Sequence, residues 1–197
     1  MAIKTPQTEL EAVNIILASV GEDSVTTLGT DTTGRAEATL DEASREIQER
    51  GWHFNTEADY ALSVASDGSV TLPTNVAQFD LEGSTYDVVL RGSRLYCRKN
   101  HSFTSFVPGV LKGTIVFILE WADMPPTAKR YITLEAAHRY QKRWFSSDTL
   151  QGFTAEDVKK ARSLFMDAES LQGDYTIFDN YSVARTLNRR SGSEFVS

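Results

Sequence analysis

Three histidines and a few acidic pairs are the side chains of this chain whose chemistry could support catalysis or metal binding. His53 lies in the stretch "GWHFN", between two aromatic residues that follow a glycine. A catalytic or metal-binding histidine needs partners at usable spacing, and neither His101 nor His138 stands in an H-E-x-x-H or C-x-x-C context. We therefore interpret His53 as part of a strand edge, on the opposite side from Trp52 and Phe54. His138 is predicted to be a hydrogen-bonded core histidine.

Glu120 and Asp123 are close enough in sequence to form the carboxylate pair that a glycosidase needs. Acidic residues at the end of a strand are more commonly solvated surface groups. The stretch "GTDTTG" lacks the Gly-Lys-Ser/Thr ending of a phosphate-binding loop, and the sequence has no G-x-S-x-G motif. The residues therefore predict no catalytic site, no metal site and no cofactor.

The composition limits the class of protein. Hydrophobic residues make up 41% of the 197 residues and charged residues 24%, which suits a globular protein with a sizeable core. No signal peptide or membrane anchor is expected, because the longest apolar run, "TIVFILEW", is too short to cross a bilayer. Cys97 is the single cysteine, so we expect no disulfide and a reducing compartment. The net charge of −7 disfavours a protein that grips nucleic acid.

The elements that would position these residues begin with two helices. Thr8 and Glu11 have the spacing of a capping box, and Gly21 stands where a left-handed C-cap residue is expected. The first apolar face comprises Leu10, Val13, Leu17 and Val20. The second helix, "RAEATLDEASREIQER", ends at Gly51, and its apolar face comprises Ala36, Leu40, Ala43 and Ile47.

After Gly51 the hydrophobic period changes from helical to that of strands. Short segments rich in β-branched and aromatic residues predict an antiparallel sheet over residues 52–121, and "WHFNT" and "SVTLP" are among the expected strands. Asp67-Gly68 and Arg91-Gly92-Ser93 fit hairpin turns. Gly51, Trp52 and Phe54 are then predicted to form the structural junction between helix and sheet.

Two further helices and a tail complete the chain. The third helix opens near Pro126, and one of its faces carries Tyr131, Leu134, His138, Gln141 and Phe145. The fourth is expected from Thr154, which has capping spacing to Asp157, to Gly173. Its apolar stripe comprises Val158, Ala161, Phe165 and Ala168.

These elements predict an α+β fold, in which a four-helix bundle carries an inserted antiparallel β region and an extended C-terminal arm. The predicted boundaries are 1–51 and 122–173 for the helical bundle, 52–121 for the β region and 174–197 for the arm.

Two surfaces are candidates for contact with another subunit or partner. Lys129, Arg139 and Arg143 share one helical face near Trp144, which could meet an acidic partner or be an ordinary solvated face. The arm carries Tyr175, Ile177, Phe178 and Tyr181, although a disordered chain end is usually depleted in such groups. The arm either packs against another subunit or returns to its own domain.

Longer stretches of the sequence resemble tail tubular protein A, the adaptor or gatekeeper of short-tailed bacteriophages of the Autographiviridae. The resemblance rests on "ELEAVNIILASVGEDSVTTLGT", on "REIQERGWHFNTE" and on "DMPPTAKRYITLEAAHRYQKRWFS". "LASVGE" and "GWHFN" at this spacing are its most specific parts, and the similarity is weakest through the expected sheet. "GWHFN" then resembles the helix-to-strand joint of that family.

The resemblance implies a structural protein of the virion tail, assembled in the host cytoplasm. Its implied arrangement is a twelve-subunit ring below the portal protein, joining the portal to the nozzle made by tail tubular protein B. Tail fibres would dock near that junction, and genome DNA would pass through the ring without specific binding. Negative side chains on a channel wall would repel phosphates and let DNA slide. The alternative hypothesis is a tail-borne hydrolase of envelope or capsule glycan, for which Glu120 would be the residue to replace.

Overall fold

The computed structural model describes residues 7–31, 33–81, 83, 85–144 and 148–172. Within them the chain forms four α-helices and five strands, so the fold is α+β with antiparallel sheets. The helices are α1 (Glu9–Ala18), α2 (Gly34–Gln48), α3 (Pro126–Trp144) and α4 (Asp148–Gln172). The strands are β1 (Thr56–Ser63), β2 (Val76–Leu81), β3 (Val88–Arg91), β4 (Arg94–Cys97) and β5 (Val110–Phe117), and the 3-10 turns are η1 (His53–Asn55) and η2 (Trp121–Asp123).

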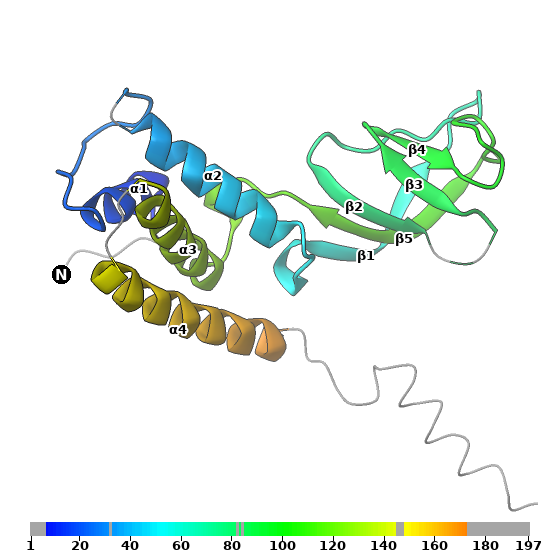
Figure 1. Ribbon diagram of the computed structural model, residues 1–197. Helices are drawn as coiled ribbons and strands as arrows, with labels where there is room; N and C mark the ends of the chain where they lie inside the picture. Colours follow the sequence, from blue (N-terminus) through cyan, green and yellow to red (C-terminus); the bar gives the residue numbers. More distant parts are fainter. Residues whose placement is uncertain (1–6, 32, 82, 84, 145–147, 173–197) are drawn as a thin grey trace, which may run out of the picture.

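The molecule is elongated, with the helices gathered at one end and the strands at the other (Figure 1). The chain passes from the helical end to the sheet end after α2 and returns after β5. Two separate hydrophobic cores follow this division, one built from all four helices and one from the strands and their loops.

The first two helices begin and end as their sequence predicts. The capping box of α1 is confirmed, since Glu11 N–H donates to Thr8 Oγ1 at 3.2 Å and Thr8 N–H donates to Glu11 Oε2 at 2.9 Å. Gly21 has φ 80°, and Glu22 N–H bonds the Leu17 carbonyl at 3.0 Å, which is the six-residue closure of a Schellman motif. The predicted apolar face of α2 is buried in full: Ala36, Leu40, Ala43 and Ile47.

The α3 helix lies at the centre of the helical core, because it packs against each of the other three helices. Tyr131, Ile132 and Tyr140 are buried on it, and so is Gln141. From α4, Ala161 and Phe165 enter this core, and Phe165 has no exposed surface. Burial of a side chain of this size contributes on the order of 1.5–3 kcal/mol to folding.

The predicted start of the fourth helix is wrong. The helix begins at Asp148 rather than Thr154, so Thr154 lies inside α4 and does not cap it. A capping pattern identifies a residue that can accept the first free N–H groups, but it does not show whether the preceding backbone is already helical. Local spacing alone therefore placed the boundary too late.

Two small sheets make up the other end of the molecule. One has the strand order β1-β5-β2 and the other is the β3–β4 ribbon, and both are antiparallel. The β3–β4 hairpin closes over Gly92 and Ser93, as predicted, because Arg91 pairs with Arg94 and Gly92 has φ 61°. Leu95, Cys97 and Ile115 are fully buried between the two sheets.

Two of the predicted strands are wrong. Residues 53–55 of "WHFNT" form η1, since Asn55 N–H turns back to the Trp52 carbonyl at 3.2 Å. In "SVTLP", only Thr71 forms a bridge, to Arg94, although Val70 and Leu72 are buried. Both segments have strand-like composition, but burial of alternate side chains does not require a continuous hydrogen-bonded ladder.

Candidate functional site: the helix–sheet junction

The junction begins where α2 ends at Gly51. This residue has φ 73°, a left-handed conformation that glycine adopts without steric cost. A Cβ atom at this position would also lie 3.1 Å from Val116 Cγ2, so the turn approaches β5 closely. Glycine thus allows the chain to leave the helix and reach the sheet within a few residues.

Trp52 and Phe54 anchor the turn to the helical core through the same residue of α4. The Trp52 ring meets Phe165 edge-on at 4.7 Å between centroids, and Phe54 meets it at 6.1 Å. Tyr131 of α3 stacks on Phe165 from 5.6 Å. The indole N–H of Trp52 donates to the Ile47 carbonyl at 2.6 Å, which satisfies its polar atom and one carbonyl near the end of α2.

The main chain of His53, rather than its side chain, makes the structural contact. Its N–H donates to Glu169 Oε2 at 2.7 Å, and the imidazole is exposed. Glu169 is only 7% exposed and extends from α4 toward this N–H. A carboxylate that accepts a main-chain N–H makes a charge-assisted bond, so Glu169 connects α4 directly to the turn.

Gln48 and Asn55 join the end of α2 to the end of β5. Gln48 accepts the Leu119 N–H at 2.8 Å and donates to the Leu119 carbonyl at 3.2 Å. Asn55 donates to the Phe117 carbonyl at 2.6 Å and to the Gln48 carbonyl at 2.9 Å. Both side chains are almost fully buried, so their loss would leave main-chain groups unsatisfied. The segment that leaves α2 for the sheet and the segment that returns from β5 to the helices are therefore hydrogen-bonded to each other.

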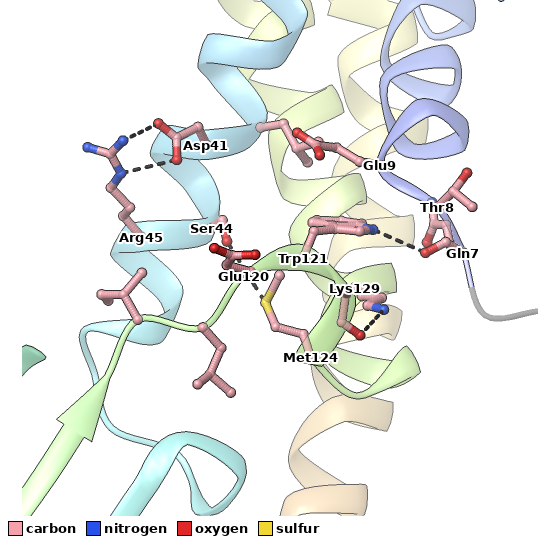
Figure 2. Close-up of a pocket in the computed structure, with 14 residues that line it drawn as sticks. Gln7, Thr8, Glu9, Asp41, Ser44, Arg45, Glu120, Trp121, Met124 and Lys129 are labelled. Carbon is pink, nitrogen blue, oxygen red and sulfur yellow. Dashed lines mark hydrogen bonds and ion pairs between the residues drawn. The ribbon is translucent and has the colours of Figure 1, made fainter. Parts of the chain in front are cut away.

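A pocket of about 800 Å³ lies beside this junction, between α2, the start of α1 and the β5–α3 connection (Figure 2). Trp121 spans it and donates its indole N–H to the Gln7 carbonyl at 3.1 Å. Ser44 contacts Met124 Sδ at 3.9 Å, and the Asp41–Arg45 pair lies at the edge. Glu120 also lines the pocket.

The polar contacts of the junction connect α2, η1, α4 and the end of β5 to one another. A family profile described as "Tail tubular protein" matches residues 10–175, which include all of α2, α3 and α4, both sheets and the junction. The chain belongs to the tail tubular protein family. A search of curated proteins found no match.

Membership gives this tail tubular protein a structural role in a bacteriophage tail and places it in the virion tail. It also implies assembly with other tail components. A structural role agrees with a site in which the polar side chains connect elements of the fold. In the described part of the chain no helix is long and apolar enough to cross a membrane.

The predicted basic surface of this tail tubular protein needs a correction. Lys129 is only 4% exposed, and its Nζ donates to the Ala122 carbonyl at 3.1 Å, so it does not lie on an exposed basic face. Its long alkyl stem is buried while the ammonium satisfies the carbonyl of η2. Arg139 and Arg143 lie further along α3 and pair with Glu46 and Glu42 of α2.

These ion pairs shift the pKa values of both partners. The hydrogen bond from Arg143 lowers the pKa of the Glu42 carboxyl, and that from Arg139 lowers the pKa of Glu46. Hydrogen bonding to Glu46 in turn raises the pKa of Arg139, against the opposing effect of burial. Arg139 also donates to Glu135 of its own helix at 2.8 Å. A role of the two arginines toward a partner stays a prediction.

The other predicted residues are distributed as follows. Glu120 and Asp123 are exposed, the first directly before η2 and the second as its last residue. His138 is half-buried, and its Nδ1 atom is enclosed without a hydrogen-bond partner in the described part of the chain, so this nitrogen does not make the predicted core hydrogen bond. Phe145 and the arm residues Tyr175, Ile177, Phe178 and Tyr181 lie outside the described residues. In the described ranges no three His, Cys, Asp or Glu side chains are grouped to hold a metal ion.

Sequence reasoning missed Gln48, Asn55 and Glu169, although a signal for two of them exists. Glu169 follows Phe165 by four residues, so it falls on the apolar stripe of its helix. Gln48 follows the buried Ser44 by the same interval. A polar residue on an apolar face must find a buried partner, so such positions can be selected from sequence even though the partner cannot.

Proposed function

We propose that this tail tubular protein is a ring-forming adaptor that joins the portal to the tail nozzle and forms part of the channel for DNA ejection. The family match over residues 10–175 carries the proposal. The proposed ring has twelve copies, and its proposed partners are the portal protein, tail tubular protein B and the tail fibres. The ring is proposed to assemble in the host cytoplasm before it enters the virion.

The junction supports an adaptor because an adaptor must hold two contact surfaces at a fixed angle. A subunit that contacts one ring through its helices and another through its sheets would transmit any hinge motion to the connection between the rings. Gln48, Asn55 and Glu169 oppose such motion, since each bonds main-chain groups across the junction. Buried polar networks of this kind specify one geometry when all members are satisfied.

The net charge of −7 supports passage of DNA without binding. Retention of DNA requires lysine and arginine side chains that displace counterions from phosphates. An acidic wall would instead repel phosphates and leave the genome free to move during ejection. We propose that the ring surrounds DNA in this way.

The arm after Gly173 is proposed to serve assembly. Tyr175, Ile177, Phe178 and Tyr181 would provide apolar contacts to a neighbouring subunit or partner ring. Arg139 and Arg143 would contribute to assembly only through the part of each side chain that stays accessible beside its ion pair with α2.

The glycan-hydrolase alternative receives no support from a specific observation. Glu120 lines the pocket beside the junction, but the described contacts there are structural. Incubation of the full-length protein with capsular glycan or peptidoglycan, beside a Glu120→Gln variant, separates the two functions. Glycan turnover that disappears in the variant would replace the adaptor proposal with an enzymatic one.

Reconstitution with the portal and nozzle proteins of the same phage tests the adaptor. We expect the full-length protein to sediment with the portal alone, and the nozzle to join only when the adaptor is present. Direct attachment of the nozzle to the portal without this protein would contradict the proposal.

A further inference from the structure

Charge is distributed unevenly along the chain. Residues 83–119 contain five basic residues and one acidic residue, a net charge of +4, whereas the chain as a whole carries −7. The remaining residues therefore carry −11. Most of this basic segment forms β3, β4, β5 and their loops, at the sheet end of the molecule (Figure 1).

The outer face of the β3–β4 ribbon concentrates these charges beside aromatic rings. Leu95 and Cys97 point into the sheet core, so the alternate residues of β4 point outward. We call this outer surface the basic ribbon face, and it comprises Arg91, Arg94, Tyr96, Arg98 and Phe103. A hollow of about 440 Å³ lies on it, lined by Asp87, Arg91, Tyr96, Arg98, Lys99 and His101.

Two arginines of the basic ribbon face are held in place by rings. Arg91 Cζ lies 3.6 Å from the centre of the Tyr96 ring, and Arg94 Cζ lies 4.7 Å from that of Phe103. Tyr96 and Phe103 meet edge-on at 4.9 Å, which links the two stacks. A guanidinium stacked on a ring keeps its in-plane N–H groups available for a carboxylate and loses less entropy when it binds one.

The acidic residues near these two arginines do not form ion pairs with them, although the charge of Asp67 acts on Arg94 from a longer distance. Asp87 pairs with Arg98 at 3.6 Å, and Asp67 accepts bonds from the N–H and hydroxyl of Ser69. In the described ranges neither Arg91 nor Arg94 has an ion pair. The face therefore presents preorganised donors for an external anion.

We propose that the basic ribbon face docks on the acidic α1–α2 connection of a second copy of this chain. That connection contains a hollow of about 650 Å³ with Glu22, Asp23 and Asp31 in its lining, where Arg35 is the one basic residue. Figure 1 shows the α1–α2 connection and the β3–β4 ribbon at opposite ends of the molecule, so the two surfaces cannot meet within one chain. The inference rests on the proposed ring and names one contact between its neighbours.

Charge complementarity favours a second copy over nucleic acid as the occupant. The proposed ring places a second copy beside every subunit, and that copy offers an acidic surface that matches the basic one. A contact between two different surfaces of the same chain is heterologous, and repetition of such a contact generates a ring when the rotation closes.

Ring assembly of charge-reversed full-length protein on the portal tests this contact. The variant Arg91→Glu/Arg94→Glu removes the basic ribbon face, and Arg91→Gln/Arg94→Gln removes its charge with less change in shape. Lys112→Glu/Arg130→Glu is the matched control, because it reverses two exposed charges elsewhere. A third protein combines Arg91→Glu/Arg94→Glu with Glu22→Lys/Asp23→Lys, which restores complementarity with opposite signs.

We expect the glutamate variant to lower the association constant between subunits by roughly tenfold or more, the glutamine variant by less, and the control to assemble like the wild type. The combined variant should recover assembly, and added salt should weaken wild-type assembly.

Normal assembly of the glutamate variant, or no recovery in the combined variant, overturns the proposed contact but leaves the adaptor intact. Loss of DNA binding in the glutamate variant with unchanged assembly would assign the face to nucleic acid. Failure of the wild type to assemble would reject the adaptor itself.

Discussion

Trp52 connects three parts of the molecule through one side chain. It follows the Gly51 turn, bonds the Ile47 carbonyl and packs on Phe165 of α4. We predict that Trp52→Ala lowers the free energy of unfolding by about 3 kcal/mol, at the lower end of the range for large aromatic residues because the ring is only half-buried.

His53→Ala is the matched comparison, and it should cost far less because its N–H bond to Glu169 survives. Urea unfolding of both variants measures the difference. Equal, small losses would show that the junction does not depend on the indole.

Glu169 is the residue-scale test of the connection between α4 and the turn. Glu169→Ala leaves the His53 N–H without its acceptor and should cost about 1–3 kcal/mol of unfolding free energy. Glu169→Gln keeps an acceptor oxygen and should cost less. Denaturant unfolding of the two variants compares them, and an alanine variant as stable as the wild type would show that the bond contributes nothing.

The sequence located the junction residues but not their bonds. Glycine followed by two large apolar residues after a helical stripe was sufficient to predict Gly51, Trp52 and Phe54 at the boundary. That Phe165 receives both rings could not be predicted, because more than one hundred residues separate them and no local pattern encodes the contact. Lys129 shows the opposite case, where a charged side chain on a helical face was assumed to be exposed and is buried.

At the scale of elements, the pairs between α2 and α3 should make stability depend on pH. The pKa values of Glu42 and Glu46 lie below their ordinary 4.5 in the folded protein. A lowered carboxyl pKa stabilises the folded state above 4.5, and this contribution is lost as the pH falls through the lowered value. Both carboxylates are about half exposed, so the effect should be small.

Unfolding free energies of the wild type and Glu42→Gln, from neutral pH to below 4.5, measure this contribution. We expect the variant to be less stable at neutral pH and the gap to close in acid. A difference in unfolding free energy that does not change with pH would show that the ion pair between Glu42 and Arg143 does not stabilise the folded protein.

Helices were predicted better than strands for a physical reason. Apolar residues at helical spacing and a capping box determined α1 and α2 locally, because both the stripe and the cap lie within one segment. The turn at 53–55 and the non-strand at 69–73 depend on partners elsewhere: Asn55 bonds β5, and Thr71 meets Arg94. The residue composition of a strand reflects the burial of its side chains on a pleated surface, but it does not determine which segment the strand pairs with.

At the scale of the whole molecule, the arm should serve assembly rather than folding. Within the described residues all four helices contribute to one buried core, and α4 places Phe165 in it. Deletion of residues 174–197 should leave thermal unfolding of the subunit nearly unchanged while abolishing attachment to the portal or nozzle. A much lower unfolding temperature would make the arm part of the fold, and a stable truncated protein that still assembles would give it another role.

The mass of the complex between this protein and the portal tests the central claim most directly. Native mass spectrometry of the reconstituted complex, with the portal mass measured separately, counts the copies that have bound. An adaptor ring predicts one closed complex with twelve copies and no populated partial rings at saturation. Binding of single copies without a defined limit, or no binding to the portal, would contradict the account.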